Sequence, residues 1–183
     1  FPRFILNSIT VRIFNALYYW KGRFKAGEKI VDWDSYFYPL DSIAKWNRIY
    51  GHKGFAQFQC VLPLKTSLEG LEVMLRVISE SRCSSLLAVL KRFGKQDSRF
   101  SFPMEGYTLA LDFPISNKSL ELMKKLDQIT LDYGGRFYLA KDSRLSAKTF
   151  ISSDDRVNEF IKMRNSFDCT EKFTSAQSER LMI

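Results

Sequence analysis

GFAQFQCVLP, residues 54–63, is the stretch of sequence on which the fold depends. Its side chains alternate with the period of two that is typical of a strand. One face would carry Ala56, Phe58, Cys60 and Leu62, and the other Phe55, Gln57, Gln59 and Val61. The first set suits a hydrophobic core. Because a buried amide without hydrogen-bond partners costs a few kcal/mol, Gln57 and Gln59 call for a ligand, a cofactor or a polar neighbour.

The elements that follow this strand predict an α+β fold. Apolar residues at helical spacing indicate a helix from a capping box at Thr66 and Glu69 to about Arg82, and a second helix from Ser119 to Tyr133. The segments SSLLAVLKRF, YTLALDFPI and RFYLA read as strands, and the loop between the first two could cover a site. The order is therefore that of a ferredoxin-like β-α-β-β-α-β core with an antiparallel sheet.

Such a sheet packs both helices on one face and leaves the other face open. The polar side of each predicted strand would collect on the open face. It contributes Gln57, Gln59, Lys91, Phe93 and Thr108. The alternative is that these residues form an ordinary polar face, covered by water or by the N-terminal helix. Lys91 alone is more often a surface lysine than a ligand.

Further segments flank this core on both sides. Apolar residues at helical spacing predict an amphipathic helix over residues 2–20. Residues 31–41 read as extended and aromatic, and Asp41 as the N-cap of a short helix to Tyr50. After Lys141 the chain becomes a charged helical tail, in which Ser152 or Ser153 could cap a helix. This tail has too few apolar positions to form a domain by itself.

Composition limits the chemistry that the chain can perform. The 183 residues include three cysteines without CxxC spacing and one histidine, His52, which we expect to be exposed in a turn. Too few ligands remain for a zinc site, and we predict no metal, no disulfide framework and no Cys-His nucleophile. Reduced cysteines favour a cytoplasmic location. Polar residues interrupt every apolar run near Phe1, which fits neither a membrane span nor a signal peptide.

The net charge of +8 favours anionic partners such as phosphates, nucleic acid or an anionic membrane surface. Lys53 to Ala56 match the start of an RNA-recognition signature. The match fails at Gln57, where an aromatic residue should stack on a base, and it lies on the first strand instead of the third. We therefore predict no nucleic-acid partner. Asp34, Asp41 and Asp112 form no spaced pair for acid-base catalysis.

Four motifs together carry a family resemblance. YFYPLDSIAKWNRIYGHKGFAQFQCVLP, LAVLKRFG, FPMEGYTLALDFPI and GGRFYLAKDSR resemble, in order and spacing, the C-terminal half of FAD-linked oxidoreductases of the vanillyl-alcohol oxidase superfamily. The similarity covers about residues 33–181. It implies a substrate-binding (cap) domain over residues 1–140 and a return segment over 141–183 that packs on an FAD-binding domain outside this chain. The first residue, Phe1, also suggests a fragment or a processed product.

The resemblance also implies roles for single residues. Gln57 and Gln59 match a pair of active-site glutamines, and Lys91 and Phe93 match residues of the substrate pocket. Lys141 matches a catalytic lysine beside flavin and substrate, and Tyr138 matches a tyrosine that contacts the flavin. The implied activity is oxidation of a secondary alcohol of a sugar or polyol, phosphorylated or lipid-linked, by hydride transfer to FAD. Such a substrate makes peripheral membrane association a further expectation.

Three positions at the expected pocket depart from the family pattern. Phe37 stands where the family has an active-site tyrosine, and Thr108 and Ala110 stand where it has asparagine and cysteine. A smaller and less polar pocket floor leaves the substrate open. The alternatives are the cap of a sugar-lactone or hydroxy-acid oxidase of the same superfamily, and a binding module without catalytic activity.

Overall fold

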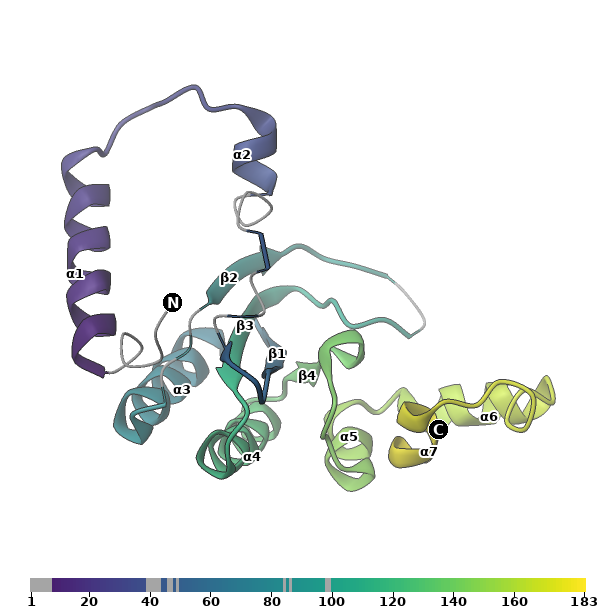
Figure 1. Ribbon diagram of the computed structural model, residues 1–183. Coiled ribbons are helices and arrows are strands. Elements are labelled where there is room, and N and C mark those ends of the chain that lie inside the picture. Colours follow the sequence, from purple (N-terminus) through teal and green to yellow (C-terminus); the bar gives the residue numbers. More distant parts are fainter. Residues whose placement is uncertain are drawn as a thin grey trace. The chain divides into compact units, whose positions relative to one another are not determined.

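The structure is a computed structural model that describes residues 8–38, 44–45, 48, 50–83, 85, 87–97 and 100–183. The chain divides into two compact units, Phe1–Phe55 and Ala56–Ile183. Figure 1 shows the ribbon of both units, and each is described by itself. The boundary predicted after residue 140 stays a prediction.

The described part of the first unit includes the α-helices α1 (Ser8–Phe24) and α2 (Trp33–Phe37). The amphipathic helix predicted near the N-terminus is present, and it extends beyond Trp20 to Phe24. The prediction of an extended segment at 31–41 was wrong over α2. Asp32 explains the difference, because its carboxylate caps the helix by accepting hydrogen bonds from the N–H groups of Asp34 (3.1 Å) and Ser35 (3.3 Å). Most of the helix predicted after Asp41 lies outside the described residues.

The second unit is built on a four-stranded sheet with the strand order β2-β3-β1-β4. Its strands are β1 (Phe55–Pro63), β2 (Ala88–Phe93), β3 (Gly106–Pro114) and β4 (Arg136–Phe137). β1 pairs with β4, and β2 with β3, in antiparallel fashion. With α3 (Ser67–Ser81) and α4 (Asn117–Asp132), the element order is β-α-β-β-α-β. The predicted α+β class with an antiparallel sheet is confirmed.

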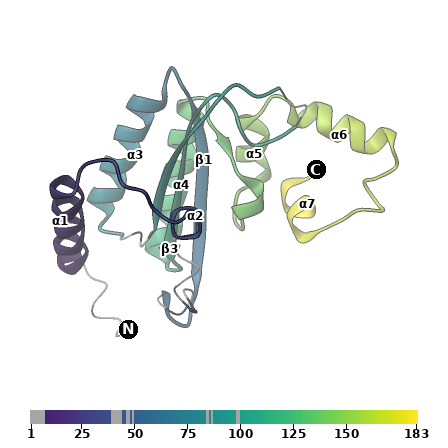
Figure 2. The ribbon, with the colours of Figure 1, turned by 90° about the horizontal axis from the view of Figure 1, so that it is seen from above.

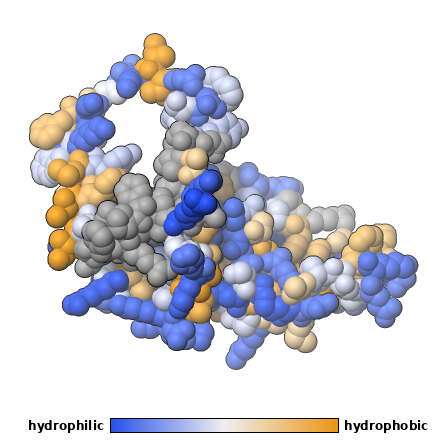
Figure 3. All heavy atoms as spheres, viewed as in Figure 1, coloured by the Kyte–Doolittle hydropathy of each residue, from blue (hydrophilic) through white to orange (hydrophobic). Residues whose placement is uncertain are grey.

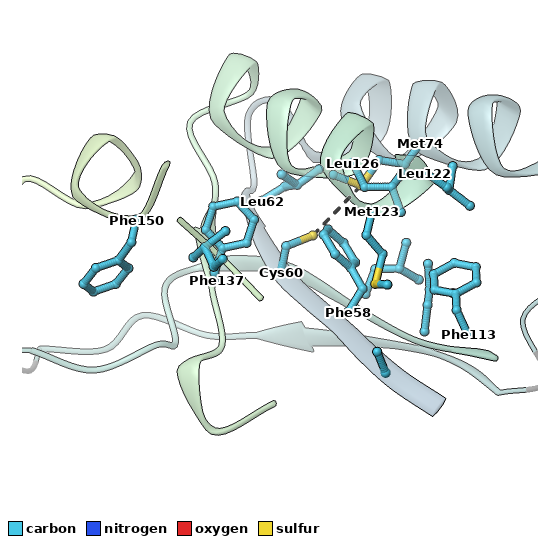
Figure 4. Packing of buried hydrophobic residues seen from close by; sticks show 14 of the residues in the cluster. Phe58, Cys60, Leu62, Met74, Phe113, Leu122, Met123, Leu126, Phe137 and Phe150 are labelled. Atoms are coloured by element: carbon cyan, nitrogen blue, oxygen red, sulfur yellow. Dashed lines mark hydrogen bonds between the residues drawn. The ribbon is translucent and has the colours of Figure 1, made fainter. Parts of the chain in front are cut away.

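Helices α3 and α4 cover one face of the sheet (Figures 1 and 4). The predicted alternation of β1 is confirmed, since Ala56, Phe58, Cys60 and Leu62 are all buried against these helices. Met74 from α3 and Met123 from α4 fill the layer above the strand, and both are fully buried (Figure 4). This layer fixes which side of every strand faces away from the helices.

Several predicted boundaries were wrong for local reasons. Thr66 does not cap α3 with its side chain, because its hydroxyl donates to the Tyr133 carbonyl (2.8 Å) at the end of α4. The β2 strand begins at Ala88, later than predicted. RFYLA forms only the two residues of β4, since the chain then turns into the 3₁₀ helix η3 (Leu139–Lys141).

The C-terminal tail belongs to the second unit and contains three helices, α5 (Ala147–Ser153), α6 (Val157–Ser166) and α7 (Ala176–Leu181). Ser152 and Ser153 end α5 and cap no helix, so that prediction was wrong. Figures 1 and 2 show α5 beside α4, with α6 and α7 farther from the sheet. The tail joins the core through widely spaced apolar residues, namely Leu145, Phe150, Val157 and Leu181.

Ion pairs hold the start of this tail in place. The guanidinium of Arg144 donates two hydrogen bonds to the Asp127 carboxylate on α4, at 2.6 and 2.7 Å. Arg180 on α7 donates to the Asp142 carboxylate at 2.8 Å. Two-pronged arginine–carboxylate contacts fix orientation as well as distance, so the segment after β4 has a defined path. Among the described residues, no helix is both long and apolar enough to cross a bilayer.

Candidate functional site

The face of the sheet opposite α3 and α4 brings three of the predicted site residues together. The side-chain amide of Gln59 on β1 donates to the hydroxyl of Thr108 on β3 (3.2 Å). That hydroxyl in turn donates to the Cys60 carbonyl (2.8 Å). Thr108 is opposite Lys91 in the β2–β3 register, so the lysine lies beside this pair on the same face.

The sequence predicted that the Gln59 amide needs a polar partner, and Thr108 is such a partner. Thr108 is 1% exposed, whereas Gln57 and Gln59 are half-buried. Thr108 therefore forms a fixed floor, and the two amides stand at its edge. A side-chain amide carries two N–H donors and a carbonyl acceptor, so Gln59 retains groups that can bind hydroxyls of a ligand.

Aromatic residues border this floor. Phe93 lies at the end of β2, and Tyr138 follows β4, where its N–H donates to the Gln59 carbonyl (3.0 Å). The ring of Phe102 packs against both, with centroid distances of 6.0 Å to Phe93 and 4.7 Å to Tyr138. The loop before β3 thus reaches over the site, as predicted, but the sequence did not single out Phe102.

Lys141 ends the 3₁₀ helix η3 and is exposed. Its N–H donates to the Tyr138 carbonyl (3.0 Å), which ties the lysine to the tyrosine through the backbone. The short turn therefore presents an aromatic ring and an ammonium group from neighbouring positions. These are two of the residues for which the family resemblance implies a place beside the flavin.

The predicted open face is closed in part. Val61, expected on the same face of β1 as Gln57 and Gln59, is fully buried, and Asp112 on β3 is 2% exposed. Because β1 and β3 are the two inner strands of the sheet, their side chains are flanked on both sides. Access to this face is greater at the outer strand β2, where Lys91 is exposed.

A cavity of about 200 Å³ lies next to Tyr138. Its lining includes Phe102, Phe150, Leu139 and the pair Arg136 and Asp154. The Asp154 carboxylate accepts from Arg156 (2.7 Å) and lies 3.4 Å from Arg136. Burial by itself would raise the pKa of Asp154, but the bonds from Arg156 and the charge of Arg136 outweigh it and lower that pKa. The Asp154 carboxylate at this edge of the cavity is therefore paired with two guanidiniums.

Cys60 is not a candidate nucleophile despite its place beside the floor. Its thiol points into the core toward Met74, with 4.0 Å between the sulfur atoms (Figure 4). Burial raises the pKa of Cys60 to about 12, so the reactive thiolate is not formed near neutral pH. Within the described ranges, no group of three potential ligands could hold a metal ion.

Comparison with known proteins gives the site its context. No protein-family model matches the chain. The chain is 36% identical to decaprenylphosphoryl-β-D-ribose oxidase of Mycolicibacterium smegmatis over 185 residues, which cover all of this chain and 40% of that oxidase. The predicted resemblance to an oxidase is confirmed. The match is consistent with a C-terminal part of an FAD-linked oxidase.

A second relative shows how far the similarity extends. An uncharacterized protein in the mprA 5′ region of Streptomyces coelicolor is 31% identical over 113 residues, which cover 61% of this chain and 31% of that protein. The chain thus spans less than half the length of both relatives. The activity of the oxidase belongs to its whole length, and for this chain it enters only as a proposal.

Proposed function

We propose that this chain is the substrate-binding part of an FAD-dependent oxidoreductase that oxidises a secondary alcohol of a sugar or polyol. The observation that carries the proposal is the 36% identity to a sugar-lipid oxidase over the whole chain. The contact of Gln59 with Thr108 supports it, because Gln59, which the resemblance and the alternation both single out, meets a residue of the predicted polar face.

The residues present suit the substrate side of a flavin. Tyr138 offers a half-buried ring held by Phe102, and Lys141 offers an exposed ammonium at the end of the short 3₁₀ helix η3 that follows β4. A bound flavin would supply the hydride acceptor that alcohol oxidation needs. We place the binding of its pyrophosphate in the part of a longer protein that lies outside this chain.

Each polar residue would have a separate task in such a site. Gln57 and Gln59 would hold sugar hydroxyls and thereby orient the carbon that loses its hydrogen. Lys141 would donate a hydrogen bond to the reacting hydroxyl oxygen and stabilise the negative charge that develops there. Lys91, exposed on β2, would contact a phosphate as a point charge.

The substrate class can be tested by anaerobic flavin reduction. The longer protein that contains this chain would be mixed with a short-prenyl phosphoryl-β-D-ribose, with free ribose, with a sugar lactone and with a 2-hydroxy acid. We expect loss of flavin absorbance to be fastest with the phosphoryl ribose. Reduction only by the lactone or by the hydroxy acid would favour the corresponding oxidase. Bound flavin that none of the four reduces would favour a binding module.

A further inference from the structure

Helix α1 carries an apolar stripe that is exposed along its length. The residues Ile13, Leu17, Trp20 and Phe24 follow one another at intervals of four, three and four, which keeps them on one side of a helix. Their exposed fractions are 55, 67, 50 and 82%. Figure 3 shows orange, hydrophobic side chains at the surface along the position of α1. A stripe of this size is far more apolar than a solvated helix needs to be.

Basic residues border the stripe on both sides. With about 100° of rotation per residue, Lys21 lies roughly 80° to one side of the stripe, and Arg23 and Arg12 lie roughly 80–100° to the other. The guanidinium of Arg23 packs 5.8 Å from the centre of the Trp20 ring. Residues 8–27 contain four basic residues and no acidic one. The charge next to the stripe is therefore of a single sign.

This arrangement selects one kind of partner. Long basic side chains can lie along an apolar surface and still reach water or a phosphate with their charged ends. An apolar stripe with aromatic residues and flanking Lys and Arg is the pattern of a helix that lies in the plane of a membrane interface.

We propose that α1 binds the surface of an anionic phospholipid bilayer and lies parallel to it. Ile13, Leu17, Trp20 and Phe24 enter the boundary between headgroups and acyl chains. Lys21, Arg23 and Arg12 contact lipid phosphates on the two sides of the stripe. The proposal is independent of the oxidase activity, because it rests on the exposure and charge of α1 alone.

Vesicle binding by the whole 183-residue chain tests this proposal. The pelleted fraction would be measured with vesicles of phosphatidylcholine alone and with vesicles that contain equal parts of phosphatidylglycerol. We expect the anionic vesicles to bind at least about tenfold more tightly, and this preference to shrink at high salt. Equal binding to both kinds of vesicle, or no binding to either, would overturn the proposal.

Two pairs of matched variants locate the binding surface. Two double variants should each weaken binding to anionic vesicles by about tenfold or more. The first combines Ile13→Ser with Leu17→Ser, and the second combines Lys21→Glu with Arg23→Glu. The controls are Leu68→Ser with Leu75→Ser on α3, and Lys118→Glu with Lys125→Glu on α4, all at exposed positions. Each control should bind within about twofold of the unchanged chain. Equal losses in control and test variants would contradict a role for α1.

Self-association is the main competing use of the stripe. The molar mass of the chain in lipid-free buffer would be measured by sedimentation equilibrium for the unchanged chain and for the Ile13→Ser, Leu17→Ser variant. We expect both to be monomers. A dimer that dissociates in this variant, together with weak vesicle binding, would assign the stripe to a second copy of the chain and refute the lipid proposal.

Discussion

Thr108 is the residue whose position explains the most about the site. Its hydroxyl accepts from Gln59 and donates to the Cys60 carbonyl, so a single buried group connects the two inner strands. The family resemblance implies an asparagine at this position, and the smaller threonine here still makes two hydrogen bonds. Asp112, on the same face of β3, is buried as well, which a simple alternation of polar residues did not predict.

The Cys60 thiol gives a direct test of the core. With its pKa raised from 9.0 to about 12, the thiolate fraction at mildly alkaline pH should be about a thousandfold lower than for an ordinary cysteine. A thiol reagent should therefore label Cys83 and Cys169 in the native chain and all three cysteines in urea. Mass spectrometry of the labelled peptides would show this. Rapid native labelling of Cys60 would contradict the packing of β1 against α3.

Asp154 should make stability depend on pH in the acid range. The pKa of Asp154 in the folded chain is below its ordinary value of 3.8. The stabilisation of the fold by this carboxylate is therefore fully present above pH 3.8 and is lost as the pH falls through the lower pKa of the folded chain. Asp154→Asn should lower the free energy of unfolding by about 1 kcal/mol at neutral pH, because water screens the partly exposed arginines. Urea unfolding should show this difference shrinking below pH 3.8. Asp155→Asn, at an exposed position, is the control; a difference that stays constant with pH would contradict the assignment.

At the scale of elements, the sequence predicted the helices and strands whose apolar residues recur at regular spacing. α3, α4, β1 and β3 each place a regular set of apolar residues against the core, so the pattern of apolar residues reveals them, although β1 and β3 also bury residues on their other face. The tail was harder to predict because its core residues Leu145, Phe150 and Val157 are widely spaced, and they lie before α5, in α5 and in α6. Phe102 carried no signal, since a loop residue is placed by its tertiary neighbours.

Gly106 tests the close approach of β3 to β1. A Cβ added there would lie 1.9 Å from the Leu62 carbonyl oxygen, a backbone atom that cannot move without disturbing the sheet. Gly106→Ala should therefore lower the free energy of unfolding by about 3 kcal/mol. Gly94→Ala is the matched control, because nothing lies within 4 Å of its added Cβ. Urea unfolding should place that control within about 0.5 kcal/mol of the unchanged chain; similar stability of the two variants would contradict the strand contact.

At the scale of the whole molecule, the chain matches only part of its relatives. It covers 40% of the oxidase and 31% of the second relative. The four motifs were enough to predict this relationship from the sequence, because they occur in order along most of the chain. The substrate did not follow from them, since Phe37, Thr108 and Ala110 differ from the family pattern at the pocket itself.

We predict that the 183-residue chain by itself does not retain flavin. The proposed function places the binding of the FAD pyrophosphate outside this chain, and Tyr138 and Lys141 would contact only the ring side. After incubation with FAD and gel filtration, the protein fraction should lack flavin absorbance and fluorescence. A yellow protein fraction would contradict the proposal that FAD is held mainly by a part of a longer protein outside this chain.

Substitution of Lys141 tests the proposed oxidase function most directly, because we propose a catalytic role for its exposed ammonium beside the flavin. The measurement is the single-turnover rate of flavin reduction in the longer protein, with Lys148→Ala on α5 as the control for loss of an exposed lysine. We predict that Lys141→Ala slows reduction by at least about 100-fold while the control keeps the original rate. A Lys141→Ala rate within about threefold of the original would contradict the account.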